Sequence, residues 1–431
     1  MKSLRNNTSK YITCLALSGM LFSSSCTKEY QDPARAKTDV ALTTQQGLTA
    51  VAIGLQRVYT LSRTGVMFNS IAANGFVTNE LSLLNAGNIP ELQLSTGGSA
   101  VDGTNTILFN LWTSANKIVY DADLVISNAN NLGDKGYASG LIAYSSIFKA
   151  LAIGNMSQYW EKIPDGTGKN VGFITRAAGF TKAISVLDNA LAVVAANPIS
   201  ASFASNVPSD VNIVNTLHAL KARYALFGGN YTLALTEANA VDLTKTSFFK
   251  FDATSPNILF TIISSNNVFQ PLNANLGLTG ANVPDAADKR IPFYTVLVGS
   301  PATLRMNGFA AATASPFPIY LPGEITLIKA EAYARQPDLT NSLIELNKVV
   351  TKTSDLFGVA AALPALTGPY TQQQLLDLIY KHRSIELYAS GLKIEDMRRF
   401  NQPLTDRKRN FFPYPFQERD NNPNTPADPS F

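Results

Sequence analysis

The sequence contains few of the residues that usually carry catalysis or bind metals. Its 431 residues include only two histidines, two cysteines and two tryptophans. His218 and His382 lie far apart, and neither has cysteines or carboxylates nearby at the spacing of a zinc site. We therefore predict that both histidines are packed structural residues and that the protein has no metal and no cofactor. Trp112 and Trp160 fall on or at the end of predicted helices, so we expect both in the core, with Trp160 closer to the surface.

The short motifs of several common enzyme classes are also missing. The sequence has no G-x-S-x-G, no Walker loop and no G-x-G-x-x-G that follows a strand. Aspartates and glutamates are spread throughout the chain, and nothing singles out a pair for glycoside hydrolysis. We predict a protein that is not an enzyme, and a surface glycosidase stays open as an alternative.

Charge is scarce, because only 15% of the residues are Asp, Glu, Lys or Arg. The formal net charge of +4 includes Lys2, Arg5 and Lys10, and no acidic residue accompanies them before Cys26. Without these three cations the net charge falls from +4 to +1. No long basic stripe is present either, so a nucleic-acid ligand is not expected.

The N-terminal residues 1–25 have the pattern of a bacterial lipoprotein signal peptide. A basic start is followed by the apolar run Tyr11–Phe22, then by the small residues Ser23–Ser25, and then by Cys26. We predict that Cys26 is lipidated and becomes the first residue of the mature chain. An ordinary secretory signal is the alternative, because a leucine usually stands where this sequence has a serine, three residues before the cysteine.

Cysteine content favours the lipoprotein interpretation. After cleavage, Cys26 would be the only cysteine of the chain and could form no internal disulfide. An unpaired thiol in an exported protein needs another explanation, and lipidation supplies one. The polar residues 26–42 are predicted to be a tether, and residues 43–431 a single domain.

Apolar residues recur at spacings of three and four over most of that domain, which predicts helices. These helices come in pairs joined by short turns, and residues 217–241 resemble a tetratricopeptide unit. The predicted helices are Leu48–Val58, Leu108–Ala129, Gly140–Trp160, Ala177–Ala196, Val211–Phe227, Tyr231–Val241, Glu324–Arg335, Leu339–Val350 and Thr371–Gly391.

Two long stretches, at about residues 60–110 and 251–320, lack this periodicity and are rich in Gly, Asn, Ser, Pro or Phe. We predict that both are irregular insertions, and binding usually belongs to loops that a rigid scaffold holds in place. Asparagine both donates and accepts hydrogen bonds, and aromatic rings stack on sugar faces or peptide side chains. The predicted ligand-binding residues are Asn79, Glu80, Asn85, Asn88, Phe269, Asn273 and Phe309.

The stretch 371–400 combines a helix with an unusual density of charge. Thr371 and Gln374 have the spacing of a capping box, and Gly391 is predicted to end the helix. Charges of both signs then alternate with large apolar residues. Buried charges are usually paired, so we predict a structural ion network of Arg383, Glu386, Asp396 and Arg399. An acid–base or ligand site at Arg383, Glu386 and Asp396 is the alternative.

This stretch and several other motifs resemble the SusD/RagB family of outer-membrane lipoproteins of Bacteroidetes. The resemblance covers nearly the whole chain. Its motifs are Lys381-His-Arg-Ser-Ile-Glu-Leu with Gly391-Leu-Lys-Ile-Glu-Asp-Met-Arg-Arg399, Glu324-Ile-Thr-Leu-Ile-Lys-Ala-Glu-Ala, Asp288-Lys-Arg290, and Phe412-Pro-Tyr-Pro-Phe-Gln-Glu418 with Asn422-Pro423. The sequence departs from the family at Lys381, where Glu is usual, and at Lys393, where Arg is usual.

The resemblance implies a mainly α fold of about four tetratricopeptide-like helical hairpins, with a less regular part that holds the ligand. It implies a lipid-anchored protein of the cell outer membrane, exposed at the surface. The expected partner is a SusC-like TonB-dependent transporter, to which the protein passes a captured nutrient. An oligosaccharide is the first candidate for that ligand, and a peptide is the alternative.

Overall fold

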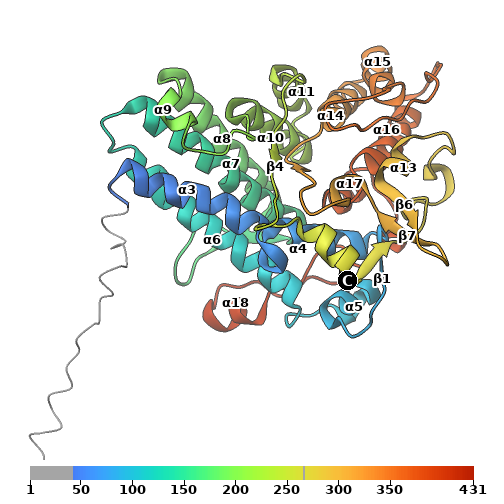
Figure 1. Ribbon diagram of the computed structural model, residues 1–431, viewed down its shortest axis with the longest axis horizontal. Coiled ribbons are helices and arrows are strands. Elements are labelled where there is room, and N and C mark those ends of the chain that lie inside the picture. The colour runs from blue at the N-terminus through green and yellow to red at the C-terminus, as the bar shows by residue number, and fades with distance from the viewer. Residues whose placement is uncertain (1–41, 266) are drawn as a thin grey trace, which may run out of the picture. The chain divides into compact units, whose positions relative to one another are not determined.

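The computed structural model describes residues 42–265 and 267–431, and Leu42–Phe431 group into one compact unit (Figure 1). The predicted signal peptide, Cys26 and nearly all of the predicted tether lie outside the described residues. Within the described residues the fold is mainly α, as predicted, and the strands form short antiparallel pairs.

The α-helices are α3 (Gln45–Thr60), α4 (Val66–Val77), α5 (Ile89–Thr96), α6 (Thr106–Ala129), α7 (Lys135–Tyr159), α8 (Arg176–Ala196), α9 (Ala201–Ala204), α10 (Ile213–Phe227), α11 (Tyr231–Ala240), α12 (Ile258–Phe260), α13 (Arg290–Tyr294), α14 (Pro322–Arg335), α15 (Leu339–Val350), α16 (Gln372–Glu386), α17 (Lys393–Arg399) and α18 (Phe416–Asn421). The strands are β1 (Leu81–Leu83), β2 (Lys162–Pro164), β3 (Phe173–Thr175), β4 (Phe248–Phe249), β5 (Phe269–Pro271), β6 (Thr295–Val298), β7 (Thr303–Met306) and β8 (Phe317–Pro318).

Four successive helix pairs are joined by short turns, as the resemblance implied. They are α6 with α7, α10 with α11, α14 with α15, and α16 with α17. Helix α8 packs on both α7 and α10 and so links the first two pairs (Figure 1). Its length and apolar composition would also suit a membrane span, but core helices that pack on their neighbours pass the same test.

Side-chain caps explain where several of these helices begin. Thr44, Asp134 and Asp338 each accept a hydrogen bond from the backbone N–H three residues further on. Thr371 and Gln374 form the predicted capping box at the start of α16. Each cap satisfies an N–H group that the helix itself leaves unpaired, and removing one costs about 1 kcal/mol.

The end of α16 differs from the prediction. The helix ends at Glu386, and Leu387 is its C-cap. Gly391 lies five residues after Glu386, and its left-handed backbone (φ 82°) forms part of the turn into α17. The glycine does mark a left-handed backbone position, but that position belongs to the connection between two helices and not to the cap of the first.

The first predicted insertion contains a helix that sequence periodicity did not reveal. All twelve residues of α4 are buried, and the helix packs on α3, α6 and α17. Its sequence VMFNSIAANGFV is apolar on all sides, so no apolar stripe stands out against a polar face. The prediction of an irregular segment was therefore wrong for residues 66–77, which belong to the core.

The tryptophans and His382 are packed, as predicted, whereas the side chain of His218 is 24% exposed and lies 2.6 Å from Glu237 Oε2. Trp112 and Trp160 are both buried, with ring centroids 4.8 Å apart in an edge-to-face arrangement. Trp160 has no exposed surface, contrary to the expectation that it lies nearer the exterior. His382 accepts a hydrogen bond at Nδ1 from the Arg290 guanidinium at 2.8 Å. Burial, together with that cation, lowers the pKa of His382 well below its usual value, which keeps the ring neutral.

Candidate ligand-binding groove

The two predicted insertions meet through β1 and β5, which pair in antiparallel register. Two further backbone hydrogen bonds extend the contact, from Leu84 N to Val268 O at 2.8 Å and from Leu272 N to Glu80 O at 3.0 Å. Loops about 190 residues apart in the sequence are thereby held side by side.

A groove of about 250 Å³ lies where these loops reach α16, α17 and the segment after α17. We call it the insertion groove. Its lining residues are Thr78, Asn79, Leu272, Asn273, Gly277, Leu278, Thr279, Asn282, Tyr380, Lys393, Met397, Gln402, Thr405 and Asp406. Most of its polar groups are neutral amides and hydroxyls, which suit a ligand rich in hydroxyl or amide groups.

Gly277 lets the second loop approach the first. Its φ is 73°, and a Cβ at this position would run into the backbone carbonyl of Asn79. Only glycine combines the left-handed backbone with the absence of a side chain. The width of the insertion groove therefore depends on this contact between two backbones.

Two groove residues keep their hydrogen-bonding capacity. Within residues 42–265 and 267–431, the side chains of Thr279 and Asn282 have no hydrogen-bond partner. Thr279 is exposed and Asn282 is half-buried. An unpaired hydroxyl and an unpaired amide at the mouth of a groove can bind a ligand without first breaking bonds within the protein.

One cation lies in the floor of the groove. Lys393, at the start of α17, is only 5% exposed. Burial lowers its pKa, and the nearby carboxylate of Glu80 opposes that effect. Asp406 supplies the groove's one carboxylate among the lining residues. The site therefore presents a single charge of each sign among many neutral polar groups.

Asn79 and Asn273 are the two predicted ligand residues that line the insertion groove. Asn79 has a left-handed backbone, with φ 62°, and its Nδ2 donates to the carbonyl oxygen of Asp406 at 3.2 Å. The Oδ1 atom of Asn273 accepts from the backbone N–H groups of Asn275 and Gly277 at 2.9 and 3.0 Å. Both side chains therefore also shape the loops from which they project.

Glu80 and Phe269 have no exposed side-chain surface and so do not face a ligand in this structure. Glu80 accepts hydrogen bonds from Asn74 Nδ2 at 2.7 Å and from the Ala389 backbone, and its burial raises the pKa of its carboxyl group. Phe269 packs on Phe68 of α4. Both residues pack beneath β1 and β5, so the prediction that they contact a ligand was wrong.

The remaining three predicted residues lie outside the lining of the groove. Asn85 is exposed and Asn88 half-exposed in the loop before α5, where Asn88 Nδ2 donates to the Asn85 carbonyl at 3.1 Å. Phe309 packs edge-to-face on Phe293, with ring centroids 5.3 Å apart, and lines a small internal cavity of about 50 Å³. The aromatic residue is thus part of the packing, while both asparagines remain accessible on the surface.

The sequence interpretation missed the groove residues of the C-terminal region. Tyr380, Lys393, Gln402 and Asp406 come from or follow the last helix pair, which was interpreted as scaffold only. The one available signal was the departure at Lys393 from the arginine usual in the family.

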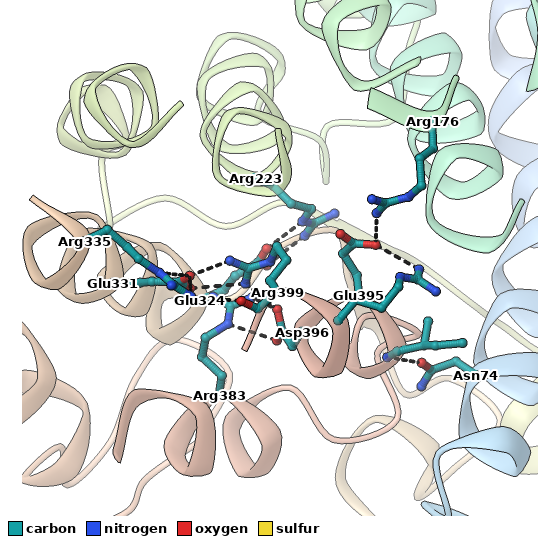
Figure 2. A network of polar contacts seen from close by, with 12 residues as sticks. Asn74, Arg176, Arg223, Glu324, Glu331, Arg335, Arg383, Glu395, Asp396 and Arg399 are labelled. Carbon is teal, nitrogen blue, oxygen red and sulfur yellow. Dashed lines mark hydrogen bonds and ion pairs between the residues drawn. The ribbon is translucent and has the colours of Figure 1, made fainter. Parts of the chain in front are cut away.

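Asp396 and Arg399 of α17 form ion pairs with neighbouring side chains, whereas Lys393 of the same helix forms none within the described residues (Figure 2). Arg383 Nε donates to Asp396 Oδ2 at 2.9 Å, and Arg399 Nη2 donates to Asp396 Oδ1 at 2.6 Å. Arg399 also pairs with Glu331 of α14, at 2.5 and 3.1 Å. We call Glu331, Arg383, Asp396 and Arg399 the α17 cluster. It ties α14, α16 and α17 together.

Glu386 belongs to a separate cluster, not to the α17 cluster as predicted. Its carboxylate pairs with Arg290 at 3.1 Å and with Lys352 at 2.5 Å. Asp288 completes the group by pairing with Arg290 at 2.6 Å. Arg290, Asp288 and Glu386 have no exposed side-chain surface, so these charges depend on one another.

These ion pairs determine the ionisation of the carboxylates. Burial alone would raise the pKa of Asp396, but Arg383 and Arg399 outweigh burial and hold that pKa below its usual value. In the same way, Lys352 and Arg290 overcome burial and lower the pKa of Glu386. No group of three or more possible metal-ligand side chains occurs among the described residues.

Several solved structures have the same fold as this chain. No family model and no curated protein matches the sequence. Among solved structures, a SusD-like carbohydrate-binding protein from Bacteroides vulgatus has a TM-score of 0.67 at 14% identity, covering 83% of this chain and 84% of its own. A SusD superfamily protein from Bacteroides thetaiotaomicron has a TM-score of 0.67 at 14% identity, with coverage of 90% and 100%. A SusD-like carbohydrate-binding protein from Bacteroides fragilis has a TM-score of 0.67 at 13% identity, with coverage of 89% and 99%.

The chain is thus a helical-hairpin protein with a groove between its irregular loops. Its fold is the SusD-like fold, and the fold implied by the sequence resemblance is confirmed.

Proposed function

We propose that this protein is a SusD/RagB-like surface lipoprotein that captures a nutrient, first of all an oligosaccharide, in the insertion groove. It delivers the ligand to a SusC-like TonB-dependent transporter and does no chemistry on it. Cys26 carries the lipid that holds it at the outer membrane. Solved proteins of the same fold that are described as carbohydrate-binding support this proposal.

The observation that carries the proposal is the character of the insertion groove. Two loops distant in sequence meet there, and neutral hydrogen-bonding side chains predominate in the lining. Thr279 and Asn282 are free to bond a ligand, as described above. Sugar hydroxyl groups both donate and accept hydrogen bonds, and amides and hydroxyls match them in both roles.

A peptide ligand is the second candidate, because the groove holds Lys393 and Asp406 together. An ammonium and a carboxylate at one site match the two ends of a short peptide. Glycoside hydrolysis is less well supported, since it needs a pair of carboxyl groups and the described lining residues include one.

Calorimetry against a panel of oligosaccharides and short peptides tests the ligand class. We expect heat of binding with at least one oligosaccharide. Binding of peptides without binding of any oligosaccharide would replace the first candidate by the second. Release of shorter products from a bound oligosaccharide would instead establish an enzyme.

Two further experiments test the anchor and the partner. A Cys26→Ser variant, expressed without the transporter, should leave the membrane fraction, and its retention there would contradict lipidation. The wild-type protein, expressed together with a SusC-like transporter from the same organism, should co-purify with that barrel from detergent. A failure to co-purify at low salt would count against the proposed partner.

A further inference from the structure

A second pocket lies against α6 and shares no lining residue with the insertion groove. Its volume is about 480 Å³, which falls within the range of roughly 300–1,000 Å³ typical of small-molecule sites. We call it the Tyr120 pocket. Its walls come from α6, from the loop between β2 and β3, and from α18 with the residue that follows it.

One wall is a single face of α6. Thr113, Asn116, Lys117 and Tyr120 recur at spacings of three and four, so their side chains lie together on the helix. Tyr120 is 52% exposed, whereas most aromatic residues in the described part of the chain are buried or half-buried. An exposed aromatic face beside polar groups costs hydration free energy unless a flat apolar partner covers it.

The opposite wall is the loop 165–172, and the C-terminal segment fixes its position. Asn422 Nδ2 donates to the Val171 carbonyl at 3.1 Å, and Asn424 Nδ2 donates to the Asn170 carbonyl at 2.7 Å. Helix α18 itself is attached to α6, because Trp112 Nε1 donates to Glu418 Oε2 at 3.0 Å (Figure 1). The pocket is therefore formed before any ligand arrives, which reduces the entropy cost of binding.

The hydrogen-bonding groups of the pocket fall into two classes. Its charges are already engaged: Glu418 accepts from Trp112 and from Asn422, and Lys117 pairs with Asp121 at 2.8 Å. The hydroxyl groups of Thr113, Thr167 and Tyr120, by contrast, have no hydrogen-bond partner in the described part of the chain. The free groups are neutral, and they come from both walls.

We propose that the Tyr120 pocket is a second binding site, for a neutral sugar unit. A pyranose ring offers one face of C–H groups that can cover the exposed ring of Tyr120. Its hydroxyls would reach Thr113 on one wall and Thr167 on the other. A charged ligand would have to compete with the bonds that Glu418 and Lys117 already make, and a purely apolar ligand would leave the hydroxyls unpaired. This site is independent of the insertion groove and of what that groove binds.

Tryptophan fluorescence can observe this site separately. Trp112 lines the pocket, and the ring centroid of Trp160 lies 4.8 Å from that of Trp112. The lining of the insertion groove includes neither of the two tryptophans. The probes are short neutral malto-, cello-, xylo- and manno-oligosaccharides, each titrated into the full chain. We expect at least one of them to change the tryptophan emission with saturation.

Three variants assign the signal. Tyr120→Ala should weaken the fluorescence-detected binding about tenfold, the change that corresponds to about 1.4 kcal/mol. Tyr120→Phe keeps the ring and should bind within a few-fold of wild type. Asn282→Ala, in the insertion groove, should leave the fluorescence titration unchanged. Circular dichroism of each variant checks that the fold is intact.

Several results would overturn the proposal. One is that none of the four oligosaccharide series changes the tryptophan emission. Another is that Tyr120→Ala binds as tightly as wild type. A third is that Asn282→Ala abolishes the signal while Tyr120→Ala retains it. Heat of binding that depends on Asn282 without any fluorescence change would reject the second site and leave the proposed function intact.

Discussion

The α17 cluster and the insertion groove lie on adjoining segments but use polar groups in opposite ways. In the cluster, Glu331, Arg383 and Asp396 are buried, Arg399 is 9% exposed, and each has an oppositely charged partner. In the groove, Thr279 and Asn282 are accessible and have no partner among the described residues. Polar groups that are satisfied internally stabilise a fold, whereas unsatisfied accessible groups are available to a ligand. We therefore assign stability to the cluster and binding to the groove.

The largest expected effect comes from breaking the cluster. Asp396→Ala would leave two buried guanidinium groups without their shared carboxylate, which costs about 3–5 kcal/mol of unfolding free energy. Chemical denaturation followed by circular dichroism measures this change. The matched control is Asp121→Ala, which removes an exposed pair with Lys117 and should cost no more than about 1 kcal/mol. Equal losses in the two variants would contradict the structural role of the cluster.

Acid should lower the stability that the α17 cluster and the other buried ion pairs provide. The pKa values of Asp396, Glu386 and Glu395 are lower in the folded protein than their usual values, because cations outweigh burial. Such groups stabilise the fold above their unfolded pKa of about 4 and lose that contribution as the pH falls through the lower folded values. Melting temperatures measured from about pH 6 to pH 2 should therefore fall steeply below about pH 4. Asp396→Asn should flatten that fall, and an identical slope in the variant would refute the assignment.

An intermediate effect is expected at the contact between the two loops. Gly277→Ala would strain a left-handed backbone and push Cβ into the Asn79 carbonyl, at a cost of about 1–3 kcal/mol. Because the loop has to move, ligand binding in the groove should be lost as well. Gly280→Ala is the matched control, since Gly280 also has positive φ but has open space around it. If both variants bind ligand equally, the backbone contact does not shape the groove.

The smallest effect on stability is expected inside the groove. Asn282→Ala removes a half-buried side chain that makes no hydrogen bond to the described residues, so the unfolding free energy should change by less than about 0.5 kcal/mol. Chemical denaturation checks this. A loss above about 1 kcal/mol would mean that Asn282 belongs to the scaffold and not to a binding surface.

The sequence predicted the helices that carry local signals, such as a cap or recurring apolar residues. The capping box of Thr371 and Gln374 and the spacing of Leu375 and Ile379 belong to the helix itself, so they can be read locally. Helix α4 was not predicted, because it is buried on all sides and has no polar face that would reveal a helical period. Its position depends on α3, α6 and α17, which the local sequence does not encode.

The groove was only partly predictable for a similar reason. Asn79 and Asn273 were found because asparagine-rich loops favour recognition, but the same rule also selected Asn85 and Asn88, which do not line the groove. Glu80 directly follows Asn79 in the sequence, yet Glu80 is buried and Asn79 only half-buried, and the tertiary structure alone makes this difference. Pairings between distant segments, such as β1 with β5, determine which side chains face a common space.

The most direct test of the central claim is a calorimetric titration of the best-bound oligosaccharide into three proteins. Wild type is compared with Asn282→Ala and with Asn131→Ala, the same substitution in the exposed turn between α6 and α7. Our account predicts that Asn282→Ala binds at least about fivefold more weakly, the loss of about one hydrogen bond, with unchanged stability, while Asn131→Ala binds like wild type. Equal affinities for all three proteins would contradict the assignment of ligand binding to the insertion groove.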